Sequence, residues 1–174
     1  MRSRDDLFEW HVLRHLDAAT NLAWWFLQNR QDAEDVVQEA MVRAYRSFGD
    51  LKGSDAKPWL MQIVRNGCLR HLEKKKRIQI VPLDETIDPN ESFRAAADAE
   101  AEALRFADAD RIQAALRALP ELYREVLVLR EFEGMNYSEI AQVAGVPIGT
   151  VMSRLSRARS MLARNVRDEV EVAS

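Results

Sequence analysis

Residues 134–164 read GMNYSEIAQVAGVPIGTVMSRLSRARSMLAR, and they predict two short helices joined by a tight turn. Asn136 is a favoured N-cap, and Glu139 three residues later can bond back to its backbone N–H, which closes a capping box. Gly145 favours the end of that helix, because the residue that follows a helix commonly takes a positive φ. Pro147 suits the start of the second helix, where its missing N–H would have no partner.

The second helix has one apolar and one polar face. Its apolar residues recur at i, i+4, i+7 and i+11, which places them in one buried stripe: Val151, Leu155, Ala158 and Leu162. No acidic residue occurs from Pro147 to Arg167, whereas a solvated helix usually mixes both signs of charge. The pattern favours a DNA-binding helix-turn-helix over an ordinary helical hairpin. The predicted contact residues are Thr150, Ser153, Arg154, Ser156, Arg157 and Ser160.

Charge is distributed unevenly along the 174 residues. The net charge is −3, which is unlike a protein that coats nucleic acid without specificity. Arginines and lysines are concentrated in 65–77 and again in 154–167, whereas 84–110 is strongly acidic. This segregation suggests two surfaces that face nucleic acid, joined by a segment of opposite charge.

The sequence predicts a cytoplasmic protein with no membrane anchor. Cys68 is the single cysteine, so no internal disulfide can form and a reducing compartment fits. The first ten residues carry acids where a signal peptide needs an apolar core. The apolar run at 22–27 is too short to cross a bilayer.

The N-terminal part of the chain predicts three helical stretches. Apolar residues at helical spacing, beginning with Leu7 and Trp10, predict one helix over 7–29, or two with a short break. Asp32 can cap the next helix, which runs to about residue 48. Pro58 can open the third. Two exposed faces are expected on these helices: Asp35, Gln38, Glu39 and Val42 on one, and Arg65, Asn66, Arg70 and Lys74 on the other.

The whole pattern predicts an all-α protein of two small helical domains. Residues 1–80 form the first domain, and 81–107 form a flexible acidic linker with prolines and a mixed run of alanine and acids. Residues 108–174 form the second domain, in which two amphipathic helices support the helix-turn-helix.

No catalytic or metal-binding motif is present. The chain has no Gly-rich phosphate loop, no CxxC and no HExxH. His11 and His15 have the spacing of metal ligands, but they lack a matching third ligand, so ordinary polar histidines are favoured. We therefore expect no enzymatic activity, no metal and no cofactor.

Three segments in this order resemble the extracytoplasmic-function group of bacterial sigma-70-type sigma factors. They are DAEDVVQEAMVRAYRSF at 32–48, PWLMQIVRN at 58–66 and LPELYREVLVLREFEGMNYSEIAQVAGVPIGTVMSRLSRAR at 119–159. The resemblance covers nearly all of 7–167. It implies that the first domain is the promoter-melting domain (sigma region 2) and the second the upstream-element domain (sigma region 4).

The resemblance also implies a role for each exposed face. The face with Asp35, Gln38, Glu39 and Val42 matches the surface that docks on the polymerase β′ coiled coil. The loop 49–57, together with Arg65, Asn66, Arg70 and Lys74, matches the reader of the minus-ten box, where a base is flipped from the melted non-template strand. The second helix of the helix-turn-helix matches the reader of the minus-thirty-five duplex. The implied partners are core RNA polymerase, through its β′ and β subunits, promoter DNA and an anti-sigma factor.

Two other functions are possible for a chain with these motifs. A stand-alone helix-turn-helix regulator would need a dimer seam or a ligand pocket, and the sequence offers neither heptads nor an effector signature. An adaptor that binds only protein would leave the two basic blocks unexplained.

Overall fold

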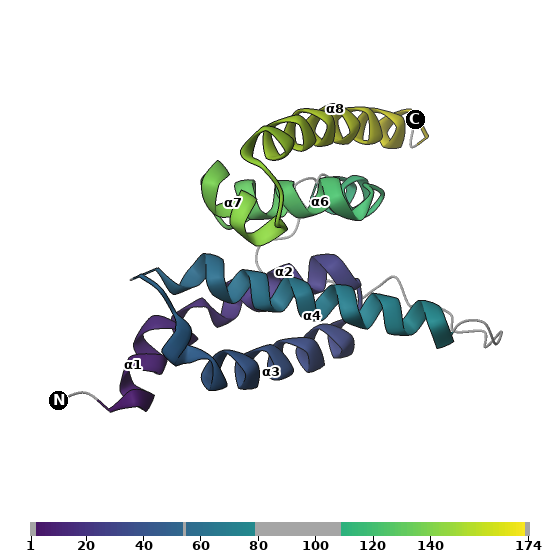
Figure 1. Ribbon diagram of the computed structural model, residues 1–174. Helices are drawn as coiled ribbons and strands as arrows, with labels where there is room; N and C mark the ends of the chain where they lie inside the picture. Colours follow the sequence, from purple (N-terminus) through teal and green to yellow (C-terminus); the bar gives the residue numbers. More distant parts are fainter. Residues whose placement is uncertain (1–2, 54, 79–108, 173–174) are drawn as a thin grey trace, which may run out of the picture.

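The computed structural model describes residues 3–53, 55–78 and 109–172, and every regular element in these ranges is a helix. Figure 1 shows α8 on one side of the molecule, then α6 and α7, then α2 and α4, with α3 on the opposite side. The all-α prediction is confirmed. The predicted linker, 81–107, falls outside the described residues.

The expected break in the first helical stretch is present. Helix α1 (Arg4–His11) is followed by the 3-10 turn η1 (Leu13–His15) and by α2 (Leu16–Leu27). The later residues of the predicted apolar series, Leu22, Trp25 and Phe26, are buried. The first four are not, since their exposed fractions are Leu7 36%, Trp10 58%, Leu13 39% and Leu16 40%. Phe8 and Val12 are buried in their place, and Phe8 meets the ring of Tyr45 edge-on at 5.1 Å. Spacing identified a helix, whereas packing against α3 selected which face is buried.

Helix α3 (Arg30–Arg46) begins earlier than its predicted cap. Asn29 is the N-cap, and its side chain accepts a hydrogen bond from the Asp32 backbone N–H at 2.9 Å. The prediction that Asp32 caps this helix was therefore wrong. Asn29 is extended (φ −140°), as an N-cap requires, and Asp32 lies in the first turn, where its charge still complements the helix dipole.

Helix α4 (Ala56–Ile78) follows the short turn η2 (Phe48–Asp50). It begins two residues before Pro58, so the proline lies within the first turn, where it removes no intrahelical hydrogen bond. The Asp55 carboxylate accepts a hydrogen bond from the Lys57 backbone N–H at 3.0 Å, which satisfies one of the free donors at this end.

The C-terminal part consists of short helices and one long one. A helix over 109–117 is followed by α6 (Glu121–Leu127), a π-helical turn η3 (Val128–Phe132), α7 (Tyr137–Ala144) and α8 (Ile148–Val172). The predicted capping box is present, because Asn136 and Glu139 exchange hydrogen bonds of 2.7 and 2.9 Å. Gly145 ends α7 with φ 66°, as expected.

The two halves of the described chain share one core. Helix α4 packs on α7, and α2 packs on α6. Buried residues of both halves, from Leu22 and Leu60 to Ile140 and Leu155, form a single hydrophobic cluster. Among the described helices, none combines the length and the apolar character needed to cross a bilayer.

Candidate nucleic-acid interface

Helix α8 has the two faces that its sequence predicts. Val151 and Ala158 are completely buried and Leu155 is 1% exposed, so the apolar stripe lies in the core. The opposite face is open to solvent. Four of the predicted contact residues are exposed there, namely Ser153, Ser156, Arg157 and Ser160, while Thr150 is half-buried.

Arg154 differs from the other predicted contact residues. Its side chain is half-buried, and its charge acts on the Glu125 carboxylate inside the protein. Its Nη1 atom is buried, with no hydrogen-bond partner among the residues that the structure describes. Arg154 therefore lies at the inner edge of the polar face, between the core and the solvent.

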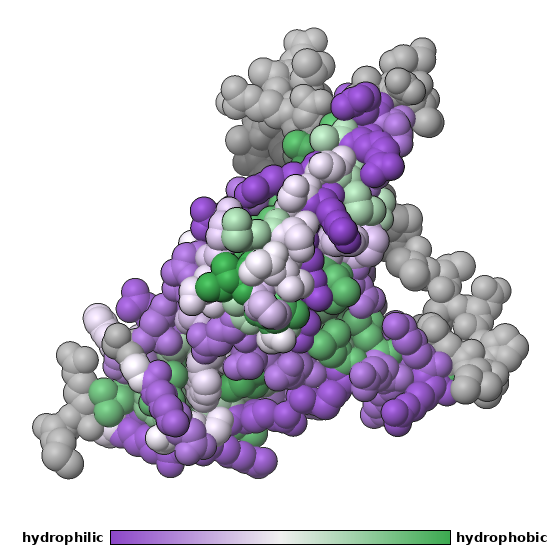
Figure 2. Space-filling view, turned by 45° about the horizontal axis from the view of Figure 1, so that its top comes forward, coloured by the Kyte–Doolittle hydropathy of each residue, from purple (hydrophilic) through white to green (hydrophobic). Residues whose placement is uncertain are grey.

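An ion pair outside the core connects α8 to the π-helical turn. The Arg159 guanidinium lies 2.9 Å from the Glu131 carboxylate, and this bond raises the pKa of Arg159 above its ordinary value. Both side chains are about half-exposed, so this pair is a surface contact that leaves the rest of the polar face free. Figure 2 shows the space-filling surface with the top of Figure 1 turned forward: hydrophilic residues predominate, and hydrophobic ones occupy limited areas.

The basic surface of α4 is only partly open. Asn66, Arg70 and Lys74 are exposed. Arg65 instead points into the contact between the two halves, where its guanidinium forms an ion pair with Glu125 of α6. The Arg65 side chain is 13% exposed and the Glu125 side chain 1%. In this arrangement Arg65 has no free surface for DNA.

Glu125 lies at the centre of a buried group of charges. Burial raises the pKa of the Glu125 carboxyl above its ordinary value, while the hydrogen bond and the charge of Arg65 oppose that rise. The charge of Arg154 acts in the same direction as that of Arg65. A buried carboxylate of this kind depends on its partners, because removing one partner leaves an uncompensated charge.

A second polar contact between the two halves surrounds Glu133. Its carboxylate forms an ion pair with Lys57 Nζ at 3.2 Å and accepts a hydrogen bond from Asn21 Nδ2 at 2.8 Å. Lys57 Nζ also donates to the Glu133 backbone carbonyl at 2.8 Å. Aromatic contacts accompany these bonds: the rings of Trp25 and Phe132 are 5.8 Å apart, and the Arg117 guanidinium lies 5.2 Å from the Trp24 ring.

Sequence reasoning missed this whole interface. It gave no role to Glu125 or Glu133. The bonded partners are 60 to 112 positions apart in the chain, so no local spacing joins them. The one available signal was an acid, Glu125, directly before the apolar run at 126–129.

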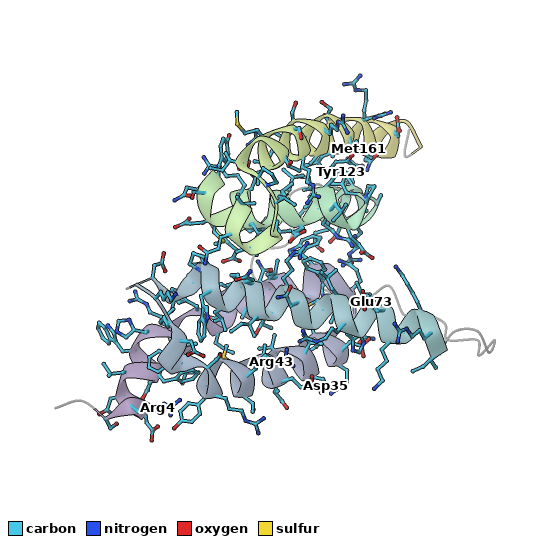
Figure 3. The ribbon with its side chains drawn as sticks, in the orientation of Figure 1. Arg4, Asp35, Arg43, Glu73, Tyr123 and Met161 are labelled. Carbon is cyan, nitrogen blue, oxygen red and sulfur yellow. The ribbon has the colours of Figure 1, made fainter. Side chains whose placement is uncertain are left out.

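The face of α3 that was predicted to dock on polymerase is exposed. Asp35, Gln38 and Glu39 face solvent, and Val42 is 51% exposed. A shallow groove runs along this face and is lined by Gln38, Glu39, Val42, Arg43 and Arg46. Figure 3 labels Asp35 and Arg43 on α3, on the opposite side of the molecule from α8.

The described residues contain no cluster that suggests metal or thiol chemistry. No three His, Cys, Asp or Glu side chains within these ranges lie close enough to hold a metal ion. Cys68 is buried, and burial raises the pKa of its thiol to about 12. A thiol of that pKa stays protonated at neutral pH and is a poor nucleophile.

Comparison with known proteins identifies the family. Residues 11–78 match Sigma-70 region 2, and residues 109–162 match Sigma-70, region 4. The RNA polymerase sigma-H factor of Pseudomonas aeruginosa is 37% identical over 163 residues, which cover 89% of this chain and 83% of that protein. The ECF RNA polymerase sigma factor SigE of Mycolicibacterium smegmatis is 35% identical over 173 residues, or 93% of this chain and 61% of the relative.

Solved structures match both halves of the chain together. The sigma factor RpoE in complex with the anti-sigma factor NepR from Bartonella quintana has a TM-score of 0.74 at 26% identity, over 92% of this chain and 96% of that one. CnrH in complex with the cytosolic domain of CnrY has a TM-score of 0.66 at 27% identity, over 95% and 90%. This chain therefore belongs to the extracytoplasmic-function group of sigma-70-type RNA polymerase sigma factors, which are transcription initiation factors for core polymerase and promoter DNA and are not enzymes.

Proposed function

We propose that this sigma factor divides promoter reading between α8, which reads the minus-thirty-five box as duplex, and α4, which reads the minus-ten box as melted strand. The observation that carries the proposal is the outward face of α8. Ser153, Arg157 and Ser160 are exposed there, and the helix has no acidic residue up to Arg167. A helix of this kind fits a major groove, where arginine can bond guanine edges or phosphates.

The exposed residues of α4 suit a single strand better than a duplex. Asn66 has an amide that can donate to and accept from the edge of a flipped base, and Arg70 and Lys74 supply charge for its phosphates. Arg65 belongs to the same surface by sequence, but Glu125 holds it between the two halves. We therefore expect α4 and α6 to separate before Arg65 contacts DNA.

Core polymerase docks on α3 in this proposal. The exposed carboxylates and amide of Asp35, Gln38 and Glu39 surround the exposed Val42, which gives a polar surface with an apolar centre. That composition suits a protein interface, in which a small apolar centre is enclosed by polar contacts. The β′ coiled coil is the proposed partner of this face, and the β subunit is expected to contact the protein elsewhere.

The test is assembly of the full-length chain with core polymerase. Asp35→Ala combined with Gln38→Ala should abolish holoenzyme formation in gel filtration while the helical circular dichroism stays unchanged. Glu73→Ala combined with Gln142→Ala removes the same two kinds of group from exposed positions on α4 and α7, and should assemble normally. Assembly of the first double variant with wild-type affinity would contradict the docking face, and failure of the wild type to bind polymerase would favour a stand-alone regulator.

An anti-sigma factor is the proposed regulator of this protein. The support comes from the solved structure of RpoE, which is bound to the anti-sigma factor NepR and matches both halves of this chain. An inhibitor that holds the two halves in this arrangement would also keep Arg65 paired with Glu125. A pull-down from the native host should recover such a protein, and repeated recovery of polymerase alone would count against it.

A further inference from the structure

Two large apolar side chains are exposed at the start of α8. Ile148 is 46% exposed and Met152 is 53% exposed, and they are one helical turn apart. The core stripe is complete without them, since Val151 and Leu155 are buried on the inner face. Around them the exposed face carries hydroxyls and arginines. The packing of this protein therefore gives no reason for their exposure.

The residue between them is also unexplained by the fold. Gly149 lies in the first turn of α8, and it is not among the glycines with positive φ. A Cβ atom added at Gly149 would meet nothing within 4 Å. Glycine in a helix costs about 1 kcal/mol relative to alanine. Neither the backbone conformation nor internal packing requires glycine at this position. The open space above Gly149 faces outward and would let another molecule approach the helix closely.

The neighbouring polar groups limit what this patch can recognise. Ser153 donates its hydroxyl to the Thr150 carbonyl at 3.0 Å, so it is already bonded within the helix. The absence of acidic residues and the exposed Arg157 favour DNA as the approaching surface. At the base edges of the major groove, the one apolar group is the C5-methyl of thymine.

We propose that Met152, with Ile148 beside it, packs against the C5-methyl group of a thymine in the upstream box and selects thymine at that position. Gly149 lets the helix approach the base edge closely enough for this contact. The inference rests on the proposed function, in which α8 lies in the major groove. It adds a specificity residue that the polar pattern of the helix does not include.

The test compares thymine with uracil, which differs only by the missing methyl group. Holoenzyme made with the full-length chain is bound to promoter fragments in which each thymine of the upstream box, on either strand, is replaced in turn by uracil. The wild type should lose about fourfold in affinity at one or two positions, the value expected for one buried methyl. Met152→Ala should bind the thymine fragment more weakly and show a thymine-to-uracil ratio near one at those positions.

Matched variants separate this contact from a general loss of binding. Met152→Leu keeps an apolar side chain and should keep most of the discrimination. Leu122→Ala removes an apolar side chain that is 47% exposed on α6 and should leave the ratio unchanged. Because the readout is a ratio, effects on polymerase assembly cancel.

Two results would overturn the inference in distinguishable ways. In the first, the wild type binds uracil and thymine equally at every position, or Met152→Ala keeps the full thymine-to-uracil ratio. Either outcome would contradict the methyl contact and would leave the proposed reading of the upstream box by α8 in place. Equal binding to a promoter with a scrambled upstream box removes the proposed function of α8 itself.

Discussion

Helices α4 and α8 both carry arginines that are predicted to contact nucleic acid, but these arginines differ in their surroundings. Arg157 of α8 is exposed. Helix α8 itself lies beyond α6 and α7, on the side of the molecule away from α4 (Figure 1). Arg65 of α4 lies in the contact between the two halves, where its side chain is only 13% exposed and is paired with Glu125. An arginine is thus exposed on one helix and held by an internal ion pair on the other. The charge of a residue indicates what it can bind, whereas its burial determines whether the fold must rearrange before it can bind.

The largest effect is expected at the buried ion pair. Glu125→Ala would leave the Arg65 guanidinium buried without an acid, and breaking a buried pair in this way costs about 3–5 kcal/mol. Separation of α4 from α6 would return Arg65 to water, so we expect a more extended molecule with unchanged helix content. Small-angle scattering and far-UV circular dichroism measure the two properties. An unchanged radius of gyration together with an unchanged melting temperature would show that the pair does not hold the halves together.

The two reading helices should fail at different steps. Arg157→Ala should weaken binding of holoenzyme to the upstream duplex by about 1–3 kcal/mol if it contacts a base edge. Asn66→Ala should leave that binding nearly intact and reduce strand opening, since its proposed partner is a flipped base. Permanganate footprinting beside a binding assay separates the steps. Equal losses of duplex binding in both variants would rule out the division of labour.

The helix glycines of the two halves offer a smaller contrast. A Cβ at Gly67 would lie 2.9 Å from Val36 Cγ1, whereas one at Gly149 would meet nothing. Gly67→Ala should lower the free energy of unfolding by about 1 kcal/mol net, because overpacking costs about 1–3 and the helix propensity of alanine returns about 1. Gly149→Ala should raise it by about 0.5–1 kcal/mol. Urea titration measures both free energies of unfolding. If both variants changed this free energy in the same direction, the packing of α4 against α3 would be contradicted.

The smallest effect is expected at the surface pair of α8. Glu131→Gln removes the negative charge that pairs with Arg159, and exposed ion pairs contribute about 0–1 kcal/mol. The variant should melt within a few degrees of the wild type and keep the same radius of gyration. It therefore serves as the control for Glu125→Ala, since both change a glutamate on the same domain. A fall in melting temperature as large as that of Glu125→Ala would mean that the difference in exposure between the two ion pairs does not explain their contributions to stability.

The features of the structure that the sequence predicts correctly are formed by local interactions. The capping box of Asn136 with Glu139 and the turn at Gly145 are made by residues at most a few positions apart. The buried stripe of α8 repeats at a spacing that any α-helix imposes. The order of three motifs was enough to indicate the sigma factor family, because each motif folds locally. The assignments of the docking and DNA-reading residues, including Asp35 and Arg157, stay predictions.

Tertiary structure alone decided which of these residues are accessible. Helical spacing could not tell that Phe8 is buried while Trp10 is exposed, because both faces of α1 carry apolar residues. The rings of Tyr45 and Phe48, which are distant in the sequence, pack on Phe8. It could not pair Arg65 with Glu125, since contacts over 60 positions depend on how α4 meets α6. A buried carboxylate such as that of Glu125 needs a charged or hydrogen-bonding partner, because burial without one is energetically costly. That partner can come from any part of the chain that the fold brings near.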